Sequence, residues 1–386
     1  MKFILPQNIQ FVLNTLTQNG HKAYIVGGCV RDLLCGNTPH DYDVTTSALP
    51  HETQALFEKT IATGLKHGTI TVMVDNSPIE VTTFRTESVY NDSRHPESVN
   101  FVRNVSDDLA RRDFTVNAMC YNPNDGLIDL FDGQCDIKNK LLRAVGDAET
   151  RFQEDALRIL RLFRFAATLG FSIEEKTFAA ALKCAKLLKN ISAERIFSEL
   201  QKASMGSNTA ILSPLLKTYA LQNYCLYDTD FSEFDSLPHN CNLRTFALLN
   251  LTSNNLSQTL DNFKCSNAFK DYCIKMKQLV NNPHPTDKIG IKNALNFADV
   301  NTLCDALDYH QCLLKNDVVS FKKLLNEIIN SNEPYKISHL DISGKDIINL
   351  GFDGKNVGEK LEFLLQEVIK NPSINTREKL LKLICN

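Results

Sequence analysis

The chain has no tryptophan, no long apolar run and no CxxC pair among its twelve cysteines. A membrane helix needs about 20 consecutive apolar residues, so we expect a soluble protein without membrane spans. Unpaired cysteine spacing argues against a zinc site and fits free thiols in a reducing compartment. The apolar start is too short for a signal peptide, and we therefore expect a cytoplasmic location.

The chain also lacks an excess of basic residues. A formal net charge of −3 excludes a broadly basic nucleic-acid coat, although a local basic cleft is compatible with it. At 386 residues the chain is long enough to bury a large core and to form two or more domains.

The segment YIVGGCVRDLLCGNTPHDYDVTTS, residues 24–47, carries the first chemical pattern. Its apolar start predicts a buried strand, Gly27 and Gly28 predict a turn, and residues 30–34 predict a helix. Backbone amides at a helix start favour an anion, and Arg31 can add a charge-assisted hydrogen bond. The turn therefore indicates a phosphate site.

Asp41 and Asp43 follow on a segment that we expect to be extended, which would place both carboxylates on one strand face. Paired carboxylates favour a hard divalent cation, and a phosphate cradle beside them suits phosphoryl or nucleotidyl transfer. Metal-dependent sugar transfer also uses Asp-x-Asp, but it leaves the double glycine and Arg31 unexplained. For Asp32 we expect a helix cap or a local ion pair.

The segment DDLARRDFTVNAM, residues 107–119, joins Arg111 and Arg112 to Asp113. Two arginines can hold a triphosphate, and the carboxylate can accept a hydrogen bond from a ribose hydroxyl. An exposed turn with weak surface ion pairs is the alternative interpretation.

The sequence EDALRILRLFRFAA predicts one helix whose narrow polar edge contains Glu154, Asp155, Arg158 and Arg161. A carboxylate accepts from the exocyclic amino group of cytosine or adenine, and a guanidinium donates to the neighbouring base acceptors. Uracil and guanine present an acceptor instead and would be rejected. Arg161 and Arg164 would orient Asp155 or reach the phosphates. A surface pair of Asp155 with Arg158 is the alternative.

The remaining pattern predicts an α/β part followed by a helical part. Residues 9–18 predict an amphipathic helix, and TITVMV and IEVTTF predict an antiparallel hairpin in a mixed sheet. From residue 151 onward apolar residues recur at helical spacing, with loops at NNPHPTD and NSNEPYK.

In this order, GGCVRD, DYD, RRDFTVNAM, EDALRILR and SAERIFSEL resemble class II tRNA nucleotidyltransferases, the bacterial CCA-adding enzymes of the polymerase-beta-like superfamily. The resemblance continues into the C-terminal ISGKDIINLGFDGKNVGEKL and implies an α+β fold. A mixed-sheet catalytic head would occupy residues 1–145 and a helical, base-recognising neck residues 146–205. A helical body and tail that bind tRNA would occupy residues 206–386.

The resemblance implies a role for each of ten positions. Magnesium would be held by the catalytic pair Asp41 and Asp43. Eight further positions would contact the phosphates, the ribose and the base edge of the nucleotide or complete its pocket: Gly28, Arg31, Arg112, Asp113, Asp155, Arg158, Arg161 and Arg164. Glu154 matches a structural position, and Glu80 is a candidate third carboxylate that the resemblance does not make a firm metal ligand.

The segment TFRTESVYNDSRHPESVNFV, residues 83–102, bears on which nucleotides are added. Family members that stop after two cytidines tend to lack it. Here the family pattern is matched by Arg85, Tyr90, Asp92, Arg94 and Pro96, with His95 where a basic residue is common. Complete CCA addition is therefore favoured over CC addition, while addition of the terminal A alone stays open.

The resemblance implies template-independent addition of CCA to the tRNA 3′ end from CTP and ATP, by two-metal nucleotidyl transfer with release of pyrophosphate. A bacterial poly(A) polymerase, which we expect to carry a longer and more basic tail, and a catalytically silent RNA-binding protein are the competing interpretations. A homodimer is one option for the assembly. GFDGKNVGEKL lacks the GxxxxGK[ST] order and predicts a helix cap that touches tRNA.

Overall fold

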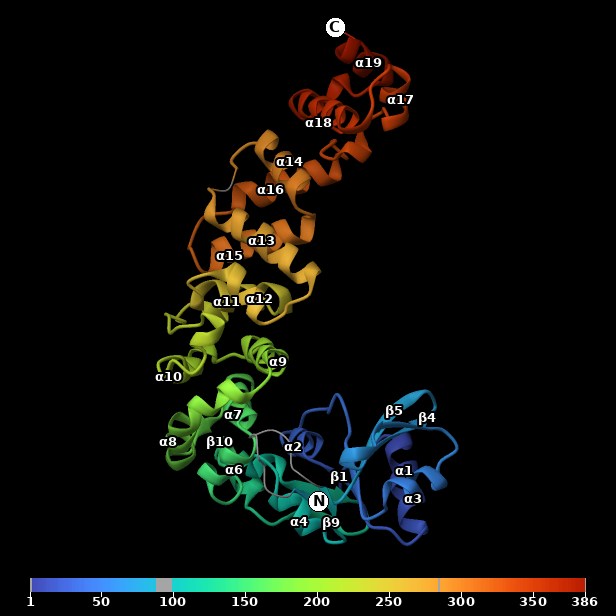
Figure 1. Ribbon diagram of the computed structural model, residues 1–386, viewed down its shortest axis with the longest axis vertical. Coiled ribbons are helices and arrows are strands. Elements are labelled where there is room, and N and C mark those ends of the chain that lie inside the picture. Colours follow the sequence, from blue (N-terminus) through green and yellow to red (C-terminus); the bar gives the residue numbers. More distant parts are fainter. Residues whose placement is uncertain (1, 88–98, 284, 386) are drawn as a thin grey trace. The chain divides into compact units, whose positions relative to one another are not determined.

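The computed structural model describes residues 2–87, 99–283 and 285–385 (Figure 1). The chain divides into two compact units, Met1–Phe231 and Ser232–Asn386. The boundaries expected at residues 145 and 205 both fall inside the first unit and stay predictions.

The first unit contains a seven-stranded mixed sheet in the order β3-β4-β5-β2-β1-β8-β9. Neighbouring strands are antiparallel except β2 and β5, which run parallel. The strands are β1 (Ala23–Val26), β2 (Val44–Thr46), β3 (Thr60–Gly64), β4 (Thr69–Val74), β5 (Ser77–Thr83), β8 (Met119–Asn122) and β9 (Gly126–Asp129). The predicted mixed sheet is confirmed.

The predicted hairpin joins β4 to β5 through Asp75 and Asn76. Both residues have positive φ, +50° and +62°. Two left-handed residues in a two-residue connection match the twist of the flanking strands, and Asp and Asn tolerate this conformation well. This part of the fold therefore follows from local sequence.

Helix α1 (Gln7–Gln18) covers the sheet with one apolar face. Its four buried residues, Ile9, Val12, Leu13 and Leu16, recur at helical spacing and are at most 3% exposed. They belong to one core with residues of β1, β2, β4, β5 and β8. The predicted amphipathic helix is confirmed, and its burial fixes the sheet that carries the site.

Shorter elements connect the sheet to a group of helices in the same unit. They are α2 (Gly28–Leu34), α3 (Pro50–Leu56), β6 (Arg85–Glu87), β7 (Val99–Phe101), α4 (Val105–Ala110), η2 (Thr115–Asn117), α5 (Gly133–Lys138) and β10 (Leu141–Leu142). Strands β6 and β7 pair antiparallel. Arg85 begins β6 and donates to the carbonyl of His67. The predictions for Tyr90, Asp92, Arg94, His95 and Pro96 concern positions outside the described residues.

The helical part of the first unit contains α6 (Ala148–Glu154), α7 (Leu157–Leu169), α8 (Glu175–Cys184) and α9 (Ala193–Ser204). Helices α7 and α9 pack together, and α7 ends at Gly170 in the left-handed conformation. The single helix expected from Glu154 onward is wrong at its start. Glu154 ends α6, whereas Asp155 is extended, with φ −134° and ψ 102°.

The second unit is helical, as predicted. Its helices are α11 (Cys241–Thr252), α12 (Leu256–Asn262), α13 (Asn267–Asn281), α14 (Lys288–Phe297), α15 (Val300–Cys312), α16 (Val319–Asn330), α17 (Gly344–Asn349), α18 (Gly354–Lys370) and α19 (Arg377–Cys385). The predicted loops follow α13 and α16. In GFDGKNVGEKL, Asp353 occupies the N-cap position of α18 without a side-chain capping hydrogen bond, and the residues from Gly354 onward form the start of the helix. Its contact with tRNA stays a prediction.

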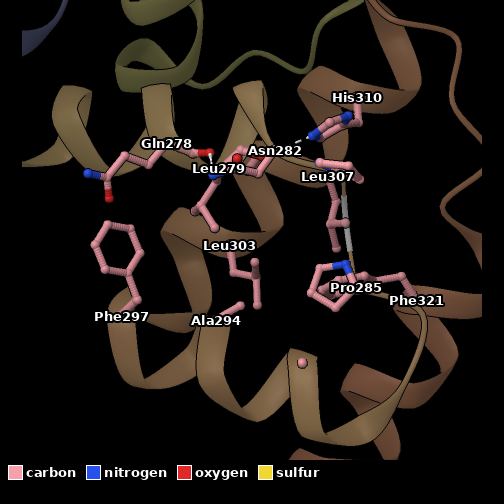
Figure 2. A pocket seen from close by; sticks show the side chains of 13 residues that line it. Gln278, Leu279, Asn282, Pro285, Ala294, Phe297, Leu303, Leu307, His310 and Phe321 are labelled. Atoms are coloured by element: carbon pink, nitrogen blue, oxygen red, sulfur yellow. Dashed lines mark hydrogen bonds between the residues drawn. The ribbon is translucent and has the colours of Figure 1, made fainter.

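A mainly apolar cavity of about 270 Å³ lies among α13, α14, α15 and α16 of the second unit (Figure 2). Its polar lining includes His310, whose Nε2 lies 3.1 Å from the Leu279 carbonyl oxygen. None of the ten predicted site residues lines this cavity.

All twelve cysteines are free thiols. Within the described ranges, no helix combines the length and apolar character needed to cross a membrane.

Candidate nucleotide and metal site

The glycine turn connects β1 to α2 and leaves room for an arginine. Gly27 caps α2 with φ +81°, a conformation that glycine adopts without strain. A Cβ atom there would lie 2.9 Å from Nη1 of Arg112. A Cβ on Gly28 would lie 3.6 Å from Nη2 of Arg31, an ordinary contact distance. The turn thus brings two arginine side chains close to backbone.

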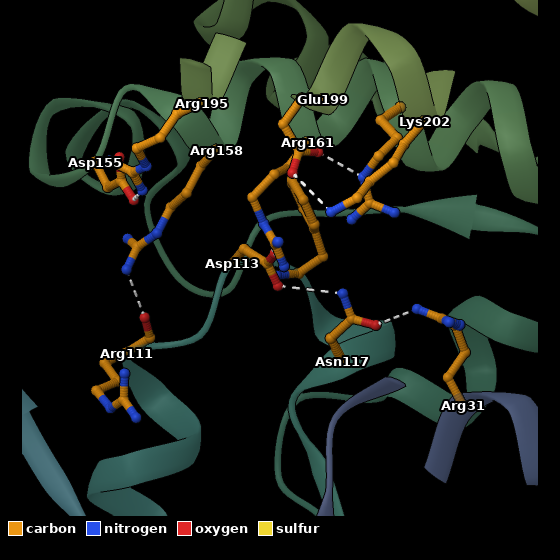
Figure 3. Close-up of polar contacts among 12 residues, drawn as sticks. Arg31, Arg111, Asp113, Asn117, Asp155, Arg158, Arg161, Arg195, Glu199 and Lys202 are labelled. Atoms are coloured by element: carbon orange, nitrogen blue, oxygen red, sulfur yellow. Dashed lines mark hydrogen bonds and ion pairs between the residues drawn. The ribbon is translucent and has the colours of Figure 1, made fainter. Parts of the chain in front are cut away.

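Arg31 on α2 is only 8% exposed. Its Nη1 donates to Oδ1 of Asn117 at 2.7 Å (Figure 3). Its Nε and Nη2 donate to Oδ1 of Asp32 at 3.0 and 2.8 Å. The local ion pair expected for Asp32 is confirmed, and the guanidinium of Arg31 is held from two directions.

Asp41 and Asp43 precede strand β2 and do not lie on it, so the expected strand position is wrong. The partner strand β1 ends at Val26, where the glycine turn leaves the sheet; the Val26 amide still donates to the Asp43 carbonyl at 3.0 Å, and the paired register of β2 begins at Val44. The Asp41 side chain is 86% exposed, and its Oδ2 lies 2.9 Å from Nδ1 of His40.

The pairing of β2 with β5 nevertheless places Asp43 beside a second carboxylate. Val44 of β2 is paired with Val81 of β5, so Asp43 and Glu80 are the residues just before a paired position on parallel neighbours. Asp41, Asp43 and Glu80 all line one cavity of about 800 Å³. These three carboxylates come from two segments whose paired residues, such as Val44 and Val81, are 37 residues apart in the sequence.

The electrostatic environment of Asp43 fits a cation. Partial burial raises the pKa of its carboxyl, Glu80 and Asp41 raise it further, and Arg112 lowers it. Within the described residues, no group of three or more histidine, cysteine, aspartate or glutamate side chains is already closed around a metal position. Oxygen donors that repel one another are still the ligand chemistry that Mg²⁺ prefers.

The Arg-Arg-Asp segment is built around Asp108 of α4, a carboxylate with no exposed surface. Arg111 donates to its Oδ1 at 2.8 Å and Arg112 to its Oδ2 at 3.2 Å. Burial alone would raise the pKa of the Asp108 carboxyl, but Arg112 and Arg111 lower it. The alternative of weak surface ion pairs is therefore wrong, because the shared carboxylate is buried.

Asp113 is also buried and accepts four hydrogen bonds. Oδ2 receives Nε and Nη2 of Arg161 at 2.8 and 2.6 Å. Oδ1 receives the Phe114 amide at 2.8 Å and Nδ2 of Asn117 at 3.2 Å. Burial would raise the pKa of Asp113, but Arg161 and these other donors lower it to about 2. Because a carboxylate has about four acceptor positions, a ribose hydroxyl would have to share one.

Arg158 is fixed by three groups from two segments. Nη1 donates to Oε2 of Glu154 at 2.6 Å and to the Arg151 carbonyl at 3.1 Å. Nη2 donates to the Arg111 carbonyl at 2.8 Å. Arg158 thus forms its ion pair with Glu154 at i−4 and Asp155 forms its own with Arg195, so the alternative of a surface pair between Asp155 and Arg158 is wrong.

Asp155 instead connects two helices. Its Oδ1 accepts the Leu157 amide at 3.0 Å at the start of α7, and its Oδ2 accepts Nη2 of Arg195 at 3.2 Å. The expectation that Arg161 or Arg164 orients Asp155 is wrong, since Arg195 of α9 makes that contact (Figure 3).

Phe165 lies beneath three guanidinium groups. The Arg164 guanidinium carbon is 3.7 Å from the ring centroid, and those of Arg31 and Arg161 are each 5.3 Å away. Arg164 also donates through Nε to the buried Glu199 at 2.5 Å. An aromatic face attracts cations, so the ring favours this crowding of like charges.

Sequence reasoning missed five residues that hold the site together: Asp108, Asn117, Phe165, Arg195 and Glu199. All five lie within motifs already recognised. Arg195 and Glu199 are four residues apart on α9, a spacing that places both on the face toward α7. That spacing was the available signal for these two residues.

Comparison with known proteins places this geometry in a family. Two family profiles match the first unit, the Poly A polymerase head domain over residues 23–143 and the Probable RNA and SrmB- binding site of polymerase A over residues 170–229. A CCA-adding enzyme of Oceanobacillus iheyensis is 35% identical, with 97% of this chain and 96% of that protein covered. The chain belongs to the CCA-adding enzyme family.

Other CCA-adding enzymes are similar to this chain over most of its length. The one from Lactococcus lactis is 39% identical, with 93% of this chain and 92% of that protein covered. The crystal structure of the Bacillus stearothermophilus CCA-adding enzyme in complex with CTP has a TM-score of 0.84 and 30% identity, covering 99% of this chain and 98% of that one. The Thermotoga maritima CCA-adding enzyme complexed with tRNA shares the fold, with a TM-score of 0.66, 21% identity and coverage of 99% and 96%. The expected family and fold are confirmed.

Proposed function

We propose that this member of the CCA-adding enzyme family extends the 3′ end of tRNA with CCA, using CTP and then ATP without a nucleic-acid template. One observation carries the proposal. Asp155 and Arg158, the pair assigned to the base edge, are each held by other groups of the protein. Side chains fixed in this way can read a base in place of a template strand.

Magnesium would be held by Asp41 and Asp43, with Glu80 as a third carboxylate. The three side chains line one cavity, and burial, followed by the charges of Glu80 and Asp41, raises the pKa of Asp43; a bound cation would offset the repulsion among the three carboxylates. When bound, two such ions lower the pKa of an attacking ribose hydroxyl and stabilise a departing pyrophosphate. The protein supplies the carboxylates that fix the ions beside the sheet.

The phosphates would lie at the glycine turn. Gly28 leaves the turn without a side chain, and Arg31 and Arg112 both reach it. Arg31 is held by Asn117 and Arg112 by Asp108, so neither guanidinium must be ordered when the nucleotide arrives. Arg161 and Arg164 add positive charge near Arg31, because all three face Phe165.

Base choice would follow from unpaired polar groups. Cytosine and adenine offer an amino group to the Asp155 carboxylate, while Arg158 donates to the ring acceptor beside it. Uracil would direct a carbonyl oxygen at the same carboxylate, which costs a few kcal/mol in a desolvated site. Asp113 would meet the ribose by sharing one of its acceptor positions.

The finer assignments of partners and domains belong to this proposal. Head, neck, and body with tail are proposed at residues 1–145, 146–205 and 206–386, and the last of these would bind tRNA. The twelve free thiols support a reducing, cytoplasmic setting. Addition of A alone or of CC alone is the nearest alternative, since the same site would serve either, and a homodimer is an option for the assembly.

Three tRNA substrates distinguish these activities. The purified chain is incubated with tRNAs that end before CCA, after C and after CC, with CTP and ATP supplied separately and together. Complete addition predicts CTP incorporation on the first two substrates and ATP incorporation on the third. Incorporation of ATP alone on the third tRNA would identify an A-adding enzyme, and long adenosine runs on any RNA would identify a poly(A) polymerase.

A further inference from the structure

Asn117 connects the arginine proposed for the phosphates with the carboxylate proposed for the ribose. It ends η2 and is 5% exposed. Its Oδ1 accepts Nη1 of Arg31 at 2.7 Å, and its Nδ2 donates to Oδ1 of Asp113 at 3.2 Å (Figure 3). A guanidinium only donates and a carboxylate only accepts, so the two partners fix the orientation of the amide.

The other contacts of the two partners do not replace this connection. The remaining hydrogen bonds that the structure gives Arg31 go to Asp32, the next residue along its own helix. The other hydrogen bonds to the Asp113 carboxylate come from Arg161 and from the Phe114 amide. Asn117 is thus the group through which a residue of α2 and a residue after α4 share one hydrogen-bonded network.

We propose that Asn117 is a positioning residue that aims Arg31 at the nucleotide phosphates and Asp113 at the ribose 2′-hydroxyl. The assignment rests on the proposed function of the same site and adds a determinant of ribonucleotide selection to it. Removing the amide frees the Arg31 guanidinium to rotate toward Asp32. It also frees Oδ1 of Asp113, whose direction then depends on Arg161 and one backbone amide.

The test uses Asn117→Leu, which keeps a branched side chain of similar size and removes both hydrogen bonds. Calorimetry measures the binding of inorganic tripolyphosphate, CTP and dCTP to the full chain. Loss of a buried hydrogen bond to a charged group predicts about tenfold weaker tripolyphosphate binding. The same loss at Asp113 predicts about a tenfold smaller preference for CTP over dCTP.

Asn122 provides a matched control. It is 2% exposed in β8 and uses its amide in the same manner, donating to the Ala23 carbonyl at 2.7 Å and accepting the Asn124 amide at 2.8 Å. Its partners are backbone groups. Asn122→Leu should lower the melting temperature by an amount similar to Asn117→Leu while leaving all three dissociation constants within about twofold of the parent.

Double-mutant cycles separate positioning from general destabilisation. In an Arg31→Met background, Asn117→Leu should no longer weaken tripolyphosphate binding but should still reduce the preference for CTP over dCTP. In an Asp113→Asn background the pattern should reverse. Additive effects in both backgrounds, or unchanged binding by Asn117→Leu, would overturn the proposal. Asn117→Ser serves if the leucine variant does not fold.

Failure of the proposed function gives a different result. If the parent chain incorporates no nucleotide into tRNA, the assay of the previous subsection fails while the binding cycles can still be measured. If incorporation is normal but Asn117→Leu changes neither the preference for CTP over dCTP nor tripolyphosphate binding, only the positioning role is refuted.

Discussion

Arg195 on α9 contacts the carboxylate of Asp155 at 3.2 Å, across forty residues of sequence. The other oxygen of Asp155 accepts the Leu157 amide at the start of α7. One side chain therefore begins a helix and presents a carboxylate that a second helix holds in place. The helix start and the proposed base contact depend on the same rotamer.

Asp155→Asn should relax base selection with little loss of stability. Asparagine keeps an oxygen for the Leu157 amide but offers an amide nitrogen that can donate to the O4 atom of uracil. We expect UTP incorporation to rise about tenfold or more relative to CTP in single-nucleotide extension assays. Asp155→Ala should show the same relaxation together with about 1 kcal/mol of lost stability, because the helix start loses its acceptor. Unchanged selectivity in both variants would contradict the base-reading role.

Asp41→Ala should abolish incorporation while nucleotide binding is partly kept. The side chain is exposed and makes its ion pair with His40, so the fold does not depend on it. Without this oxygen donor we expect a loss of at least about a thousandfold in single-turnover rate. Glu58→Ala, which removes another exposed acid of the same unit, is the control. Chelation of divalent cations should reproduce the loss in the parent chain, and full activity of Asp41→Ala would refute the metal assignment.

Asp113 should make stability depend on pH in the acid range. Its pKa is about 2 in the folded chain against an ordinary 3.8, so the folded state binds fewer protons than the unfolded state between these values. The contribution is complete above pH 3.8 and is lost as the pH falls through about 2. A difference of nearly two pKa units corresponds to about 2 kcal/mol. Denaturant titrations at several pH values between 2 and about 5 give the free energy of unfolding of the parent and of Asp113→Asn. The slope of this free energy against pH should be steeper for the parent. Parallel curves would contradict this role.

Phe165→Leu should weaken triphosphate binding more than it weakens the fold. The substitution keeps an apolar side chain but removes the ring face shared by Arg31, Arg161 and Arg164. With about 0.5–1 kcal/mol per cation–π contact, tripolyphosphate affinity should fall about three- to tenfold. Phe163→Leu, a buried ring of the same helix that faces Phe178, is the matched control and should change stability alone. Equal affinities for the two variants would exclude a role for the ring in phosphate binding.

The hairpin, the helix α1 and the glycine turn were predictable because their causes are local. Asp75 and Asn76 accept a left-handed turn, and the four buried residues of α1 recur at helical spacing. The break between α6 and α7 was not predictable in this way, because apolar residues continue at helical spacing across it. The Asp155 side chain competes with the helix for the Leu157 amide, and that competition depends on Arg195 far along the chain.

The arginine partners show the same limit. The sequence identified Arg112, Arg158, Arg161 and Arg164 as site residues, but not which acid holds each one. Adjacent acids looked like natural partners, yet Arg161 pairs with Asp113 and Arg164 with Glu199, 48 and 35 residues away. Such choices depend on the packing of α7 against α9, which no local pattern contains. The roles of these residues stay predictions until they are tested.

The parallel pairing of β2 with β5 has a consequence for insertions and deletions. The position of Asp43 beside Glu80 is set by the parallel register that aligns Val44 with Val81, two buried residues of the same core. Replacing those valines by other β-branched residues should preserve the approach. A single residue inserted after Asp43 would rotate the carboxylate to the other face of the sheet. We therefore expect natural variants of this segment to differ in side chains while keeping the same number of residues.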